Sequence, residues 1–97
     1  MKPGYIVVDI RVTDPAKFER YRALATEAVA AHGGEFLVRG GRSETLEGSW
    51  EPSRLVVVRF PSFEQARVFN ESFEYGRARA ERAGATEFFD MVLVEGG

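Results

Sequence analysis

The sequence predicts an α+β fold, a four-stranded antiparallel sheet with helices on one face. Strand-like and helix-like segments alternate along the chain in the order β-α-β-β-α-β. The two halves of that order are similar in length, and in each half an apolar strand leads through a proline-containing cap into a helix. No linker or low-complexity segment interrupts the chain, so we expect a single domain over residues 1–97.

The first strand and the first helix have clear local signals. Residues Tyr5–Val12 alternate in polarity and are rich in β-branched side chains, which is typical of a strand. Asp14 is suited to cap a helix, and Pro15 fits the first helical position because its missing N–H has no partner there. The helical pattern runs to about Ala31 and stops before Gly33, a residue that favours a left-handed C-cap.

Two glycine pairs bracket the second strand within residues 33–41. We expect this strand to bend at Gly40-Gly41 and to continue through Leu46, because glycines inside a strand pattern indicate a bulge. A connecting loop is predicted over residues 47–53. The third strand is predicted over Arg54–Phe60.

The second half contains a broken helix and the last strand. Ser62 and Gln65 form a capping-box pattern that starts the helix. The apolar stripe restarts at Ser72, so we expect two short helical pieces with a break near Asn70–Ser72. Gly84 ends the second piece, and the fourth strand is predicted over Thr86–Glu95.

The predicted sheet has more apolar surface than two helices can cover. The set expected under the helices is purely apolar: Ile6, Val8, Ile10, Val12, Val56, Val58, Phe60, Phe89, Met91 and Leu93. The opposite set is also largely apolar: Tyr5, Val7, Leu55, Val57, Phe88, Val92 and Val94. A face open to water usually alternates to polar side chains. We therefore expect a homodimer that stacks the two sheets through an isologous interface, with Trp50 packing across it.

Charged residues lie among the apolar side chains of that second face. They are Asp9, Arg11, Arg59 and Asp90. Arg39 is within reach of the same volume, but the neighbouring glycine pair leaves open which face it points to. Because neighbouring strands bring them close, Asp9 is expected to pair with Arg59, and Arg11 with Asp90. One interpretation is structural ion pairing within or across the dimer. The other is a polar lining for a small anionic or carbonyl-bearing ligand.

Four further side chains are candidates for ligand binding. Tyr21 and Tyr75 fit the edge of the core, where a buried hydroxyl needs a partner, and they also suit a ligand. His32 stands at a predicted helix end, which favours a capping role over acid–base chemistry. Ser72 is interpreted first as a helix cap, because a serine nucleophile needs a nearby base.

Composition excludes several classes of function. The chain has no cysteine and one histidine, so thiolate chemistry and histidine-rich metal sites are excluded, and no metal or cofactor is predicted. No glycine-rich phosphate loop is present. A net charge of −2 and the lack of a long apolar run argue against nucleic acid and membranes as partners. We expect a cytoplasmic protein.

Six strings carry a family resemblance. They are D-P-x-x-F-x-x-Y at 14–21, G-G-x-F-L-V-R-G-G at 33–41, E-G-x-W-x-P-x-R at 47–54, F-P-S at 60–62, F-x-x-S-x-x-Y at 69–75 and D-x-V-L-V-E-G at 90–96. Over nearly its whole length the chain resembles the DUF1330 family of the dimeric α/β-barrel superfamily. That resemblance implies a ferredoxin-like fold, pairing of two chains into a dimeric barrel and no established reaction. Monooxygenases of aromatic substrates are among the superfamily's members.

These observations predict a small homodimeric protein that binds a small molecule in a polar-lined cavity, either between sheet and helices or between the sheets of the dimer. A non-catalytic structural or sensory dimer is the alternative. A cofactor-independent, monooxygenase-like enzyme is the third hypothesis. RNA binding ranks last, because the middle strands present Val7 and Val57 where an RNA-binding sheet presents aromatics.

Overall fold

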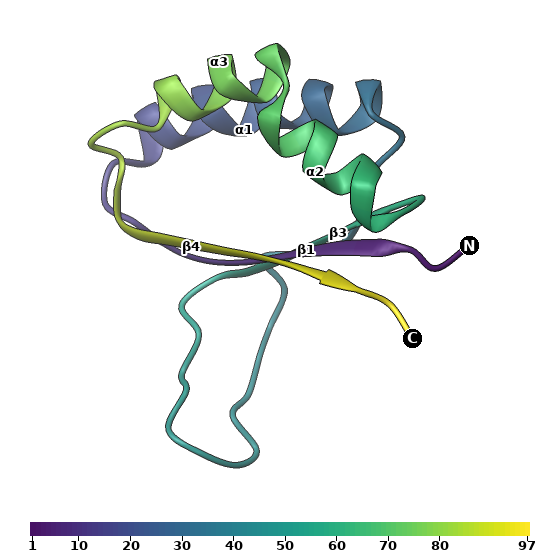
Figure 1. Cartoon of the computed structure of the whole chain (residues 1–97). Coiled ribbons are helices and arrows are strands. Elements are labelled where there is room, and N and C mark those ends of the chain that lie inside the picture. Colours follow the sequence, from purple (N-terminus) through teal and green to yellow (C-terminus); the bar gives the residue numbers. More distant parts are fainter.

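The computed structural model describes all of residues 1–97 and confirms the predicted α+β class (Figure 1). The elements are β1 (Gly4–Val12), α1 (Pro15–Ala31), β2 (Glu35–Arg39), β3 (Leu55–Phe60), α2 (Phe63–Glu71), α3 (Phe73–Glu81) and β4 (Thr86–Glu95). The strands form one sheet in the order β2-β3-β1-β4, and every neighbouring pair is antiparallel. All three helices lie on the same face of that sheet.

The helix starts form as the sequence predicts. Asp14 caps α1 and Ser62 caps α2, each accepting a hydrogen bond from a backbone amide of the first turn. The predicted break in the second helical region is the single residue Ser72. Its hydroxyl donates to the carbonyl of Phe69 at 2.7 Å and accepts from the amide of Tyr75 at 3.1 Å. One side chain thus ends α2 and begins α3.

The core lies between the sheet and the helices. All of the side chains predicted to face the helices belong to this core or pack against it. Phe60 and Tyr75 are the largest side chains that are fully buried. Gly34 allows close packing here, because a Cβ at that position would lie 2.7 Å from the ring of Phe60. The predicted assignment of strand faces is confirmed.

The predicted extent of the second strand is wrong. β2 ends at Arg39 and does not continue through Leu46, and β3 begins at Leu55. Gly40 has φ +72°, and its amide donates to the carbonyl of Leu55 at 2.8 Å, which closes the β2–β3 pairing. The chain then leaves the sheet as a long loop, residues 40–54, which projects on the side opposite the helices (Figure 1).

The outer face of the sheet, the face without helices, stays apolar and is not covered by helices of its own chain (Figure 1). Val92 is 61% exposed and Val94 is 47% exposed on β4. In the centre of this face Val7 lies opposite Val57, and both are half-buried. The surplus of apolar sheet surface that the sequence predicts is therefore present in the folded chain.

Candidate functional site

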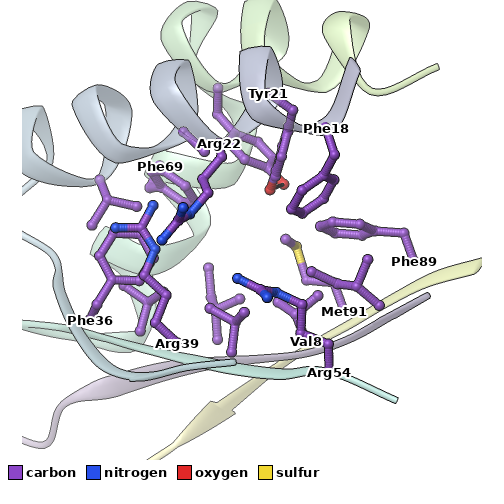
Figure 2. A pocket seen from close by; sticks show the side chains of 17 residues that line it. Val8, Phe18, Tyr21, Arg22, Phe36, Arg39, Arg54, Phe69, Phe89 and Met91 are labelled. Atoms are coloured by element: carbon purple, nitrogen blue, oxygen red, sulfur yellow. Dashed lines mark hydrogen bonds between the residues drawn. The ribbon is translucent and has the colours of Figure 1, made fainter. Parts of the chain in front are cut away.

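A cavity of about 50 Å³ lies between the helix-covered face of the sheet and the helices (Figure 2). Side chains of all four strands and all three helices reach it, together with Arg54 at the end of the long loop. Of its 17 lining residues, 14 are hydrophobic. The other three are all arginines: Arg22, Arg39 and Arg54. The cavity is thus an apolar space with a concentrated positive charge.

Three different elements bring these arginines together. Arg22 extends from α1, Arg39 is the last residue of β2, and Arg54 immediately precedes β3. Regular alternation would place Arg39 on the opposite face from Phe36. The register of β2 against β3 shifts between Phe36 and Val38, so the bulge turns Arg39 toward the helices. Figure 2 shows the three side chains extending into the same space.

Arg39 is held by an aromatic ring and a hydroxyl. Its guanidinium carbon lies 3.9 Å from the ring centroid of Phe36, and its Nη2 donates a hydrogen bond to the Oγ1 of Thr26. Burial lowers the pKa of Arg39, and the positive charges of Arg22 and Arg54 lower it further. The fold therefore places this cation where its charge is disfavoured.

Arg22 and Arg54 each contain a buried donor without a partner. The Nε atoms of both residues are shielded from solvent and make no hydrogen bond. The opposite end of Arg22 contacts Glu19, with 3.4 Å between Nη1 and Oε1. Unpaired buried donors are uncommon in native proteins because each one loses its hydration without compensation. Two of them beside the same cavity point to an acceptor that the chain itself does not supply.

A tyrosine pair forms another part of the cavity wall. The hydroxyls of Tyr21 and Tyr75 are 2.8 Å apart and buried, and Arg82 donates to the Tyr75 hydroxyl at 3.3 Å. Burial raises the pKa of Tyr21, and Tyr75 raises it further, so this phenol stays protonated at neutral pH. Both predicted tyrosines line the cavity. Their role in ligand binding stays a prediction.

The predicted pairing of Asp9 with Arg59 is wrong. The β1–β3 register places Asp9 opposite Leu55, and Arg59 opposite Tyr5. The carboxylate of Asp9 instead holds the end of the long loop. It accepts hydrogen bonds from the Nε1 of Trp50 at 3.2 Å and from the amides of the two residues before β3, at 2.9 and 3.2 Å.

The predicted pairing of Arg11 with Asp90 is also wrong. Arg11 lies 3.9 Å from Glu87, and both side chains are more than half exposed. Asp90 is exposed and lies opposite Asp9 in the β1–β4 ladder. The charged residues of the outer face therefore do not converge within one chain. Of the five charged candidates, the structure places only Arg39 at the cavity. Grouping Arg39 with the charges of the outer face is therefore wrong, because the bulge in β2 turns it toward the helices.

The anchoring of the long loop is expected to weaken in acid. Burial raises the pKa of Asp9, but hydrogen bonds from Trp50, Ser53 and Arg54 outweigh it and hold the pKa below its usual value. A carboxyl group whose pKa is lowered in the folded state stabilises the fold above about pH 4, and this stabilisation is lost as the pH falls through the folded-state pKa.

We expect Asp9→Asn to speed amide exchange at Ser53 about two- to tenfold at pH 7, because a neutral amide oxygen is a weaker hydrogen-bond acceptor than a carboxylate. Hydrogen exchange checks this.

The matched control is Glu95→Gln, which removes an exposed carboxylate from the far end of the adjacent strand, opposite Gly4. It should leave loop exchange unchanged. The difference in stability between the wild type and Asp9→Asn should shrink steadily below pH 4. A difference that grows in acid would contradict the assigned role of Asp9.

His32 and Ser72 lie outside the cavity lining. His32 caps the C-terminus of α1, and its Nε2 lies 3.1 Å from the Oε1 of Glu74 on α3. That hydrogen bond lowers the pKa of the Glu74 carboxyl. His32 thus links α1 to α3, and Ser72 joins α2 to α3. Both residues stand at helix ends, as their predicted capping roles require. Neither lies within the group of arginines and tyrosines at the cavity.

Sequence reasoning missed Arg22 and Arg54. Arg22 follows Phe18 by four residues and precedes Ala25 by three, so the helical period places it on the buried stripe of α1. That spacing was a usable signal. Arg54 carried a signal too, because it opens the predicted strand and alternation with Val56 and Val58 places it on the face toward the helices.

The structure contains no cluster of three or more histidine, cysteine, aspartate or glutamate side chains placed to hold a metal ion. None of its helices is both long enough and apolar enough to span a lipid bilayer.

Similar folds occur among solved structures. A protein of unknown function from Rhodopseudomonas palustris is 15% identical with a TM-score of 0.73, over 97% of this chain and 82% of that one. A dimeric ferredoxin-like protein of unknown function from Thermobifida fusca YX is 16% identical with a TM-score of 0.64, and the match covers 97% of this chain and 91% of that one. A proposed antibiotic biosynthesis monooxygenase from Caulobacter crescentus CB15 is 15% identical with a TM-score of 0.64, and the match covers 99% of this chain and 91% of that one. These similarities establish a ferredoxin-like fold.

The sequence itself matches no curated protein. It does match the family described as a domain of unknown function, DUF1330, over residues 3–97. That match covers almost the entire chain and agrees with the six sequence strings that suggested it. The protein therefore belongs to the DUF1330 family.

Proposed function

We propose that this protein binds a small organic molecule in the cavity between its sheet and its helices. The observation that carries the proposal is the cavity lining, in which apolar side chains surround three arginines. Small-molecule sites commonly combine an apolar wall with a few convergent polar groups. The cavity of about 50 Å³ has the volume of about one or two water molecules, which limits the ligand to a compact one.

The lining favours binding over acid–base catalysis by the chain's own residues. It contains no carboxylate, histidine or serine, and the raised pKa of Tyr21 keeps that hydroxyl neutral. A non-catalytic sensory dimer is therefore compatible with the proposal. A second candidate is cofactor-independent oxygenase chemistry inside the cavity, and it is supported by the fold shared with the proposed monooxygenase from Caulobacter crescentus.

The proposal includes a homodimer formed through the outer face of the sheet. That face exposes apolar side chains in the centre and along β4, and burying them would stabilise a pair of chains. The long loop projects from the same side of the sheet (Figure 1). The side chains of Leu46 and Trp50 on this loop are exposed. Structurally similar proteins from Thermobifida fusca YX and Jannaschia sp. CCS1 are described as dimeric. These observations support self-association through this face.

Filling the cavity tests the binding proposal. Ala25 is 6% exposed and lines the cavity, whereas Ala23 is exposed on the same helix. We expect Ala25→Leu to weaken binding of isobutyrate about tenfold or more, because the added methyl groups occupy the ligand's space. The measurement is a titration followed by the methyl resonances of Val56 and Met91, which line the cavity.

The control is Ala23→Leu, which should bind isobutyrate as the wild type does. Thermal unfolding of both variants verifies that each one is folded. Equal affinities of the two variants, or no saturable shift at the cavity methyl groups of the wild type with either isobutyrate or isobutyramide, would overturn the proposed function.

A further inference from the structure

We infer that the cavity selects an organic carboxylate, with its charged end among Arg22, Arg39 and Arg54 and its apolar body against the hydrophobic wall. The inference rests on the proposed function and adds the chemical class of the ligand. It follows from three independent features of the cavity, which concern charge, unpaired donors and the apolar lining.

The charge at the cavity is not balanced by the chain. Among the three arginines, only Arg22 has a carboxylate within ion-pair distance, and that partner, Glu19, is 3.4 Å away and mostly exposed. The charges of Arg22 and Arg54 are close enough to lower the pKa of Arg39. Like charges brought together in a partly buried space repel one another. A bound anion removes that repulsion for all three side chains at once.

The unpaired donors indicate where the anion binds. The Nε–H groups of Arg22 and Arg54 are buried and make no hydrogen bond. An ionised carboxylate has two oxygens and about four acceptor positions, and it accepts from several guanidinium donors at once. The Nη2 of Arg39 is already engaged with Thr26, so this residue is oriented before a ligand arrives. The chain therefore provides donors in excess of its own acceptors.

The lining decides between an organic acid and an inorganic anion. Fourteen of the 17 lining residues are hydrophobic, and Phe69, Phe89 and Met91 are among them. Phosphate or sulfate entering this space would exchange its hydration for contact with apolar side chains, which is unfavourable. An organic carboxylate places its polar end on the arginines and buries a hydrocarbon body against that wall. The cavity volume of about 50 Å³ limits the ligand to a small acid.

A matched ligand pair tests the inference. Isobutyrate and isobutyramide have nearly the same shape and differ in charge. We expect the wild type to bind isobutyrate about tenfold tighter or more, because hydrogen bonds to a charged group are stronger than those to a neutral one. The measurement is a titration in which the chemical shifts of the arginine Nε–H groups are recorded. The Nε–H resonances of Arg22 and Arg54 should shift on saturation with isobutyrate.

Two variants assign the effect to the cavity. Arg54→Gln should abolish the preference for isobutyrate over isobutyramide. Arg20→Gln removes an exposed arginine two residues from Arg22 and should retain that preference. Inorganic phosphate should produce no comparable shift at the two Nε–H groups. Thermal unfolding confirms that each variant is folded.

The outcomes separate this inference from the proposed function. Equal binding of isobutyrate and isobutyramide at the cavity methyl groups would overturn the selection for a carboxylate and leave small-molecule binding standing. Phosphate binding as tightly as isobutyrate would overturn the requirement for an organic body. Binding of neither organic probe would overturn the inference and the proposed function together. A preference that survives Arg54→Gln would overturn the assignment to the arginines.

Discussion

Val57→Glu is expected to convert the proposed dimer into a monomer. Val57 lies on β3 in the middle of the outer face, directly opposite Val7 on β1, and is half-buried in the single chain. In a dimer stacked through this face, the new carboxylate would be buried without a partner. We expect the dissociation constant to rise about 100-fold or more. Light scattering over a range of protein concentrations measures the change.

The control places the same substitution on the other side of the molecule. Val68 is 51% exposed on α2, in the helical layer away from the outer face. Val68→Glu should leave the mass in solution unchanged. A wild type that is monomeric at micromolar concentration, or a Val57→Glu variant that remains a dimer, would refute self-association through the sheet.

Phe60→Ala is expected to cause the largest loss of stability. Phe60 has no exposed surface, its ring centroid lies 4.9 Å from that of Phe69, and the backbone at Gly34 packs against it. Removing a buried phenylalanine side chain costs about 3–5 kcal/mol. Since small domains are stable by about 5–15 kcal/mol in total, the variant should be marginally folded. Urea denaturation measures the free energy of unfolding.

The matched control is Phe73→Ala at the start of α3, where the side chain is 76% exposed. Its effect on the free energy of unfolding should stay within about 0.5 kcal/mol, as for most surface substitutions. Equal losses in the two variants would show that the core is not centred on Phe60.

The fold was predictable because its signals are local and consistent with one another. Alternation in Tyr5–Val12 assigned both faces of β1 correctly, and caps at Asp14, Ser62 and Ser72 located the starts of the helices. The error in β2 arose where local signals are weak. Beyond Gly40 the chain has no neighbouring strand to pair with, and whether a glycine pair continues a strand or ends it depends on that neighbour.

The candidate site was only partly predictable, for physical reasons. Tyr21 and Tyr75 were found because buried hydroxyls require partners, and each is the partner of the other. Arg39 was proposed without a definite facing, because a bulge reverses the alternation and its position cannot be derived from periodicity. The outer-face charges were grouped by strand adjacency alone, but the register separates Asp9 from Arg59 by several residues along the ladder.

The carboxylate of Asp9 links the outer face of the sheet to the cavity on its other face. It lies on the outer face and accepts a hydrogen bond from the backbone amide of Arg54, and the side chain of Arg54 lines the cavity. A displacement of the long loop therefore changes the position of one of the cavity's guanidinium groups. Where association of two chains shifts this loop, occupancy of the cavity and formation of the proposed dimer are coupled by the same free energy in both directions.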